Sequence, residues 1–343
     1  MINQRLFEWH GIDTKKNLGL TTFCPRPYDT VLIDKTGSCY LCECTSWLPQ
    51  SAGNLHIQSL KEILKSPMAQ QLQGSIADGS YRYCNNQQCA WLLDKKNAPN
   101  WPKSKPTTMI KNIQLAIDDS CNLSCPSCRT KTIFERDQFQ LRKRYRLADR
   151  IIEYVKLQTH IINLHIGSDG DPFASLVYRY FVRHVKDLPN VRFTIQTNGL
   201  LINKMYERHS EMFDKLDALN ISIDGATKET YEKLRRGGSF EQLLKNLEYV
   251  KNLKTKLNFK FIIHCVIQKD NYKEIPKMIE LSKKYLADKI WFNRITNWNT
   301  FKNFGEQDVC NNKNPEHIAY LQIIENIKQS IEFKNNYIET ATL

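Results

Sequence analysis

Six segments with the pattern of a β-strand alternate with six segments that favour a helix in the part of the chain after residue 108. The expected strands cover residues 112–118, 161–166, 191–196, 218–224, 258–268 and 289–295. The expected helices cover residues 138–157, 174–187, 204–216, 228–254, 272–286 and 317–333. A strand followed by a helix, repeated in order, is typical of a parallel α/β sheet that is either open or curled into a barrel.

One face of these strands is polar, which favours a curled sheet over a flat one. In the second strand, Ile162, Leu164 and Ile166 alternate with Asn163 and His165. A flat parallel sheet with helices on both sides would be apolar on both faces. We therefore expect an α/β fold with a partial (β/α)6 TIM-like barrel, helices outside and chemistry at the C-terminal strand ends. The alternative is that the polar groups are satisfied core residues.

Composition and charge narrow the class of protein. The chain has 343 residues and a formal net charge of +13. It has no apolar run near the roughly 20 residues needed to cross a bilayer, and residues 1–13 lack the apolar region of an export signal. We expect a cytoplasmic protein without a membrane segment. The basic run at residues 142–146 is either a solvated helix face or a binding site for an anionic partner.

Three of the eleven cysteines stand directly after the first expected strand. Cys121, Cys125 and Cys128 form a Cys-x3-Cys-x2-Cys motif. Three thiolates at this spacing can bind three irons of a [4Fe–4S] cluster and leave the fourth iron open to another molecule. A structural zinc site needs a fourth Cys or His, and none follows within thirty residues.

This motif at the end of the first strand resembles the radical S-adenosylmethionine (SAM) superfamily, and the resemblance covers about residues 109–300. It implies an enzyme in which the open iron binds the amino and carboxylate groups of SAM. One electron from the cluster then cleaves SAM to methionine and a 5′-deoxyadenosyl radical, which abstracts a hydrogen from the substrate.

The resemblance also implies a set of SAM contacts near the strand ends: Gly170, Asp171, Gln196, Asn198, Ser222, Asp224, Arg235 and Val266. Asp171 stands where the family's Gly-Gly-Glu-Pro motif has Glu, and Arg235 corresponds to an arginine that pairs with the SAM carboxylate. The residue before the third cysteine is usually aromatic in the family, but it is Ser127 here, so contacts to adenine must come from elsewhere.

A second group of cysteines precedes the expected barrel. Cys24, Cys42, Cys84 and Cys89, with Gly-Asn-Leu at residues 53–55, resemble the SPASM/twitch auxiliary-cluster domain. The resemblance implies that these four cysteines bind one auxiliary [4Fe–4S] cluster, with Cys44 as a substitute for Cys42. A zinc site with four cysteine ligands needs the same residue types and is the alternative. A second auxiliary cluster is not expected. The family usually places this domain after the barrel.

These resemblances predict three parts: an auxiliary-cluster domain at residues 1–100, a radical SAM barrel at 109–300, and a loop and helix at 301–343. They imply peptide or protein modification, by crosslinking, epimerisation or oxidation, with a flavodoxin or ferredoxin as electron donor. The alternatives are a sugar or another small polar substrate, then RNA modification, and finally a non-enzymatic metal-binding scaffold. Nucleic acid ranks low because no RNA-binding module is visible.

Cys310 stands alone after the last expected strand. Loops at that end of a barrel line the mouth of the cavity. Cys310 is therefore a candidate hydrogen donor to a substrate radical or an extra ligand of the auxiliary cluster. The alternative is an ordinary loop cysteine.

Overall fold

The computed structural model describes residues 1–42, 48–86, 89, 92 and 101–340. These residues form two compact units. Unit 1 contains residues 1–118, 136–169 and 180–192, and unit 2 contains residues 119–135, 170–179 and 193–343. Helix α7 (Leu176–Val185) and strand β6 (Val191–Thr197) contribute residues to both units.

Unit 1 contains the N-terminal cysteines and the first two predicted strands. Its helices are α1 (Gln4–Trp9), α2 (Arg26–Asp29), α3 (Leu60–Ile63), α4 (Pro67–Ala77) and α6 (Gln138–Lys156). Its strands are β1 (Thr30–Asp34), β2 (Ser38–Tyr40), β3 (Gly53–Asn54), β4 (Asn112–Ala116) and β5 (Ile162–Ile166). Strand β4 pairs in parallel with β5 on one side and with β1 on the other.

Strand β1 links the cysteine-rich region to the first predicted strand. It pairs with β4 from Thr30 opposite Asn112 to Asp34 opposite Ala116, while β2 and β3 continue from β1 in antiparallel order. The strand before the linker is therefore hydrogen-bonded to the strand after it. This pairing was not predicted from the sequence.

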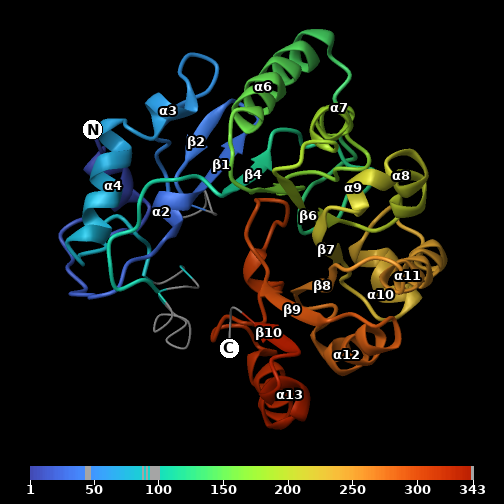
Figure 1. The fold of residues 1–343 in the computed structure, drawn as a ribbon. Helices are drawn as coiled ribbons and strands as arrows, with labels where there is room; N and C mark the ends of the chain where they lie inside the picture. The colour runs from blue at the N-terminus through green and yellow to red at the C-terminus, as the bar shows by residue number, and fades with distance from the viewer. Residues whose placement is uncertain (43–47, 87–88, 90–91, 93–100, 341–343) are drawn as a thin grey trace. The chain divides into compact units, whose positions relative to one another are not determined.

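Unit 2 contains the remaining strands, all of them parallel. Beyond β6, they are β7 (Leu216–Ser222), β8 (Lys260–Ile267), β9 (Lys289–Arg294) and β10 (Ile338–Thr340), paired in that order. Its helices and 3₁₀ turns are α8 (Ile202–Arg208), α9 (Ser210–Phe213), α10 (Lys228–Leu234), α11 (Phe240–Lys254), η2 (Tyr272–Glu274), α12 (Ile275–Lys284), η3 (Phe304–Glu306), α13 (His317–Gln329) and α14 (Ile331–Lys334). Helices α10, α11 and α12 lie on one side of strands β7 to β9 (Figure 1).

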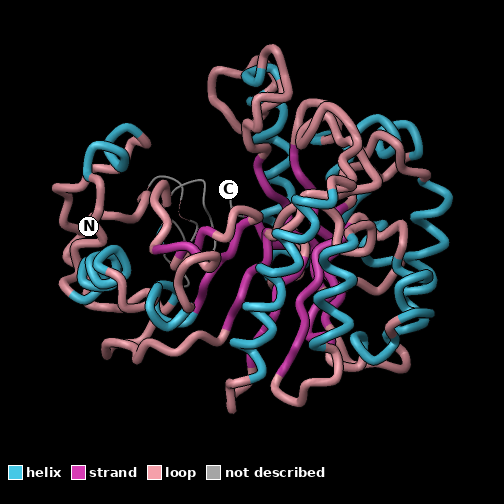
Figure 2. The backbone as a smooth tube through the Cα atoms, turned by 90° about the horizontal axis from the view of Figure 1, so that it is seen from above, coloured by secondary structure: helices cyan, strands magenta, loops and turns pink. Residues whose placement is uncertain are grey.

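Alternating burial explains why these segments form strands. In β8, Phe261, Ile263, Cys265 and Ile267 are buried, and the residues between them are only partly buried. Side chains alternate across a strand, so one face packs on the helices and the other carries the polar groups. The strands and their neighbouring helices can be followed in Figure 2. The α/β class and the six repeated strand–helix pairs are confirmed.

The prediction of a single helix over residues 228–254 is wrong. Two helices form there, because α10 ends at Leu234 and α11 begins at Phe240. Gly237 has a φ of +91° in the intervening turn, a left-handed conformation that favours glycine. The turn therefore interrupts the helix, although the spacing of apolar residues continues through it. No helix in the described residues has the length and apolarity needed to cross a membrane.

Candidate functional site

The loop after β4 brings the three predicted cysteines together in unit 2. Cys121 and Cys125 are buried, and Cys128 is exposed. The backbone N–H of Cys128 donates to the Cys125 carbonyl at 2.9 Å, and the N–H of Cys121 donates to the Ile133 carbonyl at 2.7 Å. The loop is therefore a tight turn held at its start by a backbone bridge.

Two arginines donate hydrogen bonds to sulfurs of this loop. The Arg129 Nε donates to Cys128 Sγ at 3.4 Å, and the Arg235 Nη1 donates to Cys125 Sγ at 3.9 Å. Burial raises the pKa of the Cys125 thiol, and Arg235 opposes this effect. Positively charged donors next to sulfur stabilise a thiolate, the form that binds metal.

A buried ion pair fixes Arg235. Its Nε lies 2.8 Å from Asp224 Oδ2, and the two side chains are 12% and 1% exposed. The other Asp224 oxygen accepts a hydrogen bond from the Val266 N–H at 2.9 Å. Burial alone would lower the pKa of Arg235, but Asp224 and Cys125 raise it, so the guanidinium stays charged. Three residues predicted separately, Asp224, Arg235 and Val266, therefore form one connected group beside Cys125.

Asp171 connects the loop after β5 to the end of β6. Its Oδ2 accepts hydrogen bonds from Thr197 Oγ1 at 2.7 Å and from the Asn198 N–H at 2.8 Å. The Asn198 side chain in turn donates to Asn122 Oδ1 at 2.9 Å and to Cys121 Sγ at 3.9 Å. Burial raises the pKa of Asp171, although these hydrogen bonds oppose the shift. Gly170, just before Asp171, has a φ of +68°.

The polar face of unit 2 continues along the next strands. The Gln196 amide donates to Ser222 Oγ, as the shared face predicts. On the neighbouring strands, the His264 and Trp291 rings lie 5.0 Å apart. Trp291 was not predicted as a site residue, although it alternates with buried Ile290 and Phe292.

Sequence reasoning also missed the role of Arg236. Its Nε donates to Ser124 Oγ at 3.1 Å, and its Nη2 donates to the Thr130 carbonyl at 3.1 Å. The Ser124 N–H donates to the Arg236 carbonyl at 3.0 Å. Arg236 thus ties the cysteine loop to the turn that carries Arg235. The consecutive arginines before two glycines were the available signal.

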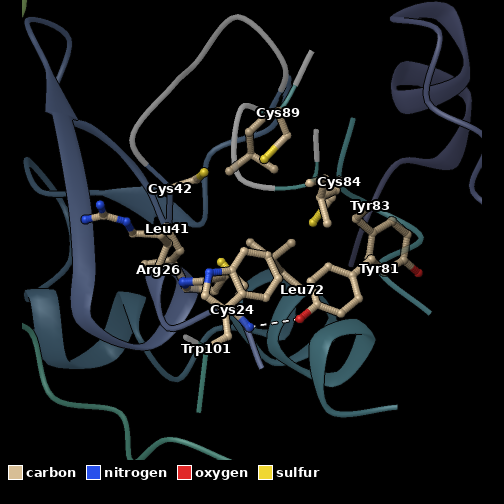
Figure 3. Close-up of a pocket in the computed structure, with 13 residues that line it drawn as sticks. Cys24, Arg26, Leu41, Cys42, Leu72, Tyr81, Tyr83, Cys84, Cys89 and Trp101 are labelled. Carbon is tan, nitrogen blue, oxygen red and sulfur yellow. Dashed lines mark hydrogen bonds between the residues drawn. The ribbon is translucent and has the colours of Figure 1, made fainter. Parts of the chain in front are cut away.

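In unit 1, all four predicted auxiliary ligands line one pocket. The sulfur atoms of Cys24, Cys42, Cys84 and Cys89 point toward a common space (Figure 3). The other residues of the pocket wall are mainly apolar or aromatic: Pro27, Leu41, Leu48, Leu72, Tyr81, Tyr83, Leu92 and Trp101, with Arg26. Cys44, the substitute for Cys42, lies outside the described residues.

The thiols of this pocket influence one another. Burial raises the pKa of Cys84, and the neighbouring Cys24, Cys89 and Cys42 raise it further. Four thiols in one apolar pocket are the donor set of a [4Fe–4S] cluster, so the residues fit that group. Within the described residues, no three His, Cys, Asp or Glu side chains form a group in the arrangement of a single metal-ion site.

An aromatic pair supports this pocket. The Tyr81 and Trp101 rings stack with centroids 5.9 Å apart, and the Tyr81 hydroxyl accepts a hydrogen bond from the Cys24 N–H at 2.8 Å. The same hydroxyl donates to the Thr22 carbonyl at 2.7 Å. Tyr81 therefore fixes the backbone that presents Cys24.

The two isolated cysteines differ in environment. Cys265 is 1% exposed in the core of unit 2, as its phase in the strand predicts. Cys310 is partly buried, and the Tyr320 hydroxyl hydrogen-bonds its thiol. Burial raises the pKa of Cys310, with a smaller opposing effect of that hydrogen bond.

Two protein families match the segments that carry the loop cysteines and the pocket cysteines. Residues 117–282 match the radical SAM superfamily. This segment is a radical SAM domain. Residues 24–90 match SPASM, an iron–sulfur cluster-binding domain, so the SPASM domain precedes the radical SAM domain here. The predicted family, enzyme class and cofactors are confirmed at this level, because the two domains imply [4Fe–4S] clusters and SAM.

Individual relatives are similar to this chain over about half of its length. The chain is 29% identical over 180 residues to a GTP 3′,8-cyclase of Limosilactobacillus fermentum, covering 50% of this chain and 51% of the relative. It is 30% identical over 171 residues to an AdoMet-dependent heme synthase of Methanosarcina barkeri, covering 48% and 44%. The chain thus spans about half the length of these relatives. Streptococcus suis SuiB aligns with a TM-score of 0.46 and 15% identity, covering 94% of this chain and 70% of SuiB.

Proposed function

We propose that this protein is a radical SAM enzyme that reductively cleaves SAM and abstracts a hydrogen from its substrate. The observation that carries the proposal is the cysteine loop, in which each sulfur accepts a hydrogen bond. Cys121 accepts from the Leu123 N–H at 3.4 Å, Cys128 from Arg129, and Cys125 from Arg235. When bound, a [4Fe–4S] cluster supplies the electron that cleaves SAM to methionine and the 5′-deoxyadenosyl radical. Cys121, Cys125 and Cys128 would hold three irons of that cluster and leave one open.

The groups around this loop have roles that fit a zwitterionic ligand. Arg235 is a charged, buried guanidinium beside Cys125 and suits a carboxylate. Asp171 and Gly170 would contact the SAM ammonium group or orient the backbone that does. Asn198 would position Cys121 through the hydrogen bond between them. Asp224 would hold Arg235 in place.

The remaining strand-end residues would contact the rest of SAM. Gln196 and Ser222, which hydrogen-bond each other, offer polar groups suited to the methionine moiety and ribose. Val266 would pack against adenine with its backbone. These assignments extend the resemblance residue by residue and are tested one at a time by SAM affinity.

We further propose that Cys24, Cys42, Cys84 and Cys89 hold one auxiliary [4Fe–4S] cluster within a domain of residues 1–100. The radical SAM domain would then cover residues 109–300 and a C-terminal part residues 301–343. The apolar pocket that these cysteines line supports the assignment. With four cysteine ligands, such a cluster would have no open iron for substrate.

For the substrate, we propose a peptide or protein that is crosslinked, epimerised or oxidised, with a flavodoxin or ferredoxin as electron donor. The SPASM domain favours this class by resemblance. A small polar substrate is the second candidate, because the curated relatives are named GTP 3′,8-cyclase and AdoMet-dependent heme synthase. RNA ranks third, since the charge of +13 is its main support.

The proposed reaction is tested with anaerobically reconstituted protein, SAM and dithionite. The wild type is expected to form 5′-deoxyadenosine, and a variant with Cys121, Cys125 and Cys128 replaced by Ala is expected to form none. Cys39→Ala is the matched control, because Cys39 is a buried cysteine of unit 1 that is not among the proposed ligands. Undiminished cleavage in the triple variant would refute the proposal.

The substrate class is tested by following 5′-deoxyadenosine formation with added candidates. A peptide substrate should raise 5′-deoxyadenosine above the substrate-free rate and give a peptide of altered mass. Stimulation by a nucleotide or sugar, with unchanged peptides, would favour the second candidate instead.

A further inference from the structure

Lys16 lies beside the auxiliary-cysteine pocket and was not part of any predicted site. Its ammonium group donates a hydrogen bond to the carbonyl of Cys84, one of the four proposed ligands. The Lys16 side chain is half-buried, and its charge interacts with the Cys84 thiol and with Asp13. A positive charge is therefore held against one ligand of the pocket by a specific contact.

The surroundings of the four thiols strengthen the electrostatic effect of this charge on the sulfur atoms. Leucines 41, 48 and 72 and Trp101 form much of the pocket wall, so the dielectric constant near the sulfurs is low. An electrostatic interaction is stronger in such surroundings than in water. Net charge and hydrogen bonding near the sulfurs are also what set the potential of an iron–sulfur cluster.

We propose that Lys16 raises the reduction potential of the auxiliary cluster, an inference that rests on the proposed assignment of that cluster. A [4Fe–4S] cluster, its four sulfides included, carries a net negative charge when four thiolates bind it, and reduction adds one more electron. The ammonium group stabilises the reduced form more than the oxidised form. Lys16 acts through Cys84 and the local field, without being a ligand.

Arg26 has an effect of the same sign on Cys24. Its backbone N–H hydrogen-bonds the Cys24 thiol, and its guanidinium, which lines the pocket, acts on the same thiol by its charge. Lys16 differs in that its ammonium group contacts a ligand residue directly, and its substitution measures the contribution of that one charge.

The test uses the full-length chain with Cys121, Cys125 and Cys128 replaced by Ala, so that only the auxiliary cluster gives a signal. Its midpoint potential is measured anaerobically by titration with dithionite and mediators, with electron paramagnetic resonance of the reduced cluster as readout. Lys16→Gln is expected to shift the ratio of reduced to oxidised cluster about tenfold at a given potential. For a one-electron couple, that is a potential lower by about 59 mV.

Two variants serve as controls. Lys15→Gln removes a neighbouring exposed lysine and should leave the potential unchanged. Lys16→Arg keeps the charge and should also keep the wild-type potential. A wild-type potential in Lys16→Gln with an intact cluster would overturn the inference. If Lys16→Gln loses its cluster, Lys16→Met, which also removes the charge but keeps the aliphatic part of the side chain, decides: a potential lowered by the same tenfold ratio supports the role of charge, and a wild-type potential contradicts it.

Failure of the underlying assignment has a different signature. If the triple-Ala background contains zinc or no metal, the auxiliary iron–sulfur cluster itself is refuted, and the role of Lys16 with it. If it contains four irons and Lys16→Gln changes nothing, only the inference about Lys16 fails.

Discussion

Removing the charge of Arg235 would leave Asp224 buried without its cationic partner. The Asp224 side chain is 1% exposed and that of Arg235 is 12% exposed. Loss of one partner of a buried ion pair costs about 3–5 kcal/mol of unfolding free energy. The Val266 N–H still donates to Asp224 after the change. We therefore expect Arg235→Gln to cost about 3 kcal/mol, at the lower end of that range.

A double variant in which both side chains are neutral separates the cost of the unpaired charge from the cost of lost packing. In Asp224→Asn combined with Arg235→Gln, no buried charge is left unpaired, and the Asn oxygen can still accept from the Val266 N–H. The double variant should therefore be more stable than the sum of the two single losses predicts, by about 2 kcal/mol.

Urea unfolding of the cluster-free chain, followed by tryptophan fluorescence under reducing conditions, measures these differences. All four proteins, wild type included, are compared at the same pH and salt. A loss below about 1 kcal/mol in Arg235→Gln, or strictly additive losses in the double variant, would refute the buried-pair reasoning.

Three further results are expected. Reconstituted protein should contain about eight irons, of which about four remain when Cys121, Cys125 and Cys128 are replaced by Ala; four irons and one zinc would contradict the auxiliary cluster. Cys310→Ala should form 5′-deoxyadenosine without product if Cys310 donates a hydrogen, or lose iron–sulfur absorbance if it is a ligand, whereas full turnover would exclude both roles. Gly237→Ala should cost about 1–2 kcal/mol through its left-handed backbone, since no atom crowds the added methyl group closer than 3.8 Å; an unchanged urea midpoint would contradict this.

Much of this fold was predictable from residue spacing, because the alternation along a strand and the closeness of residues within one loop depend only on neighbouring positions. Alternation in residues 161–166 and 258–268 gave the buried and polar faces of β5 and β8 correctly. The loop cysteines followed from spacing alone, because neighbouring thiols on one turn are necessarily close. Burial of Cys265 followed from its phase in the strand.

Pairings between distant segments were not predictable in this way. The parallel contact of β1 with β4 joins residues about 80 positions apart, and neither segment encodes its partner in its own pattern. The break between α10 and α11 required the left-handed turn at Gly237, whereas periodicity continues through it. The hydrogen bond from Arg236 to Ser124 also depends on that turn, so periodicity did not predict it.

In the proposed function, the cysteine loop holds a cluster whose open iron binds SAM. Electron–nuclear double resonance on the reduced protein, with SAM labelled by ¹⁵N in the amino group and ¹⁷O in the carboxylate, tests it directly. We expect hyperfine coupling from both labels to the cluster bound by Cys121, Cys125 and Cys128, and we expect this coupling to be lost in the triple-Ala variant. A reduced loop cluster that shows neither coupling with saturating SAM would contradict the claim.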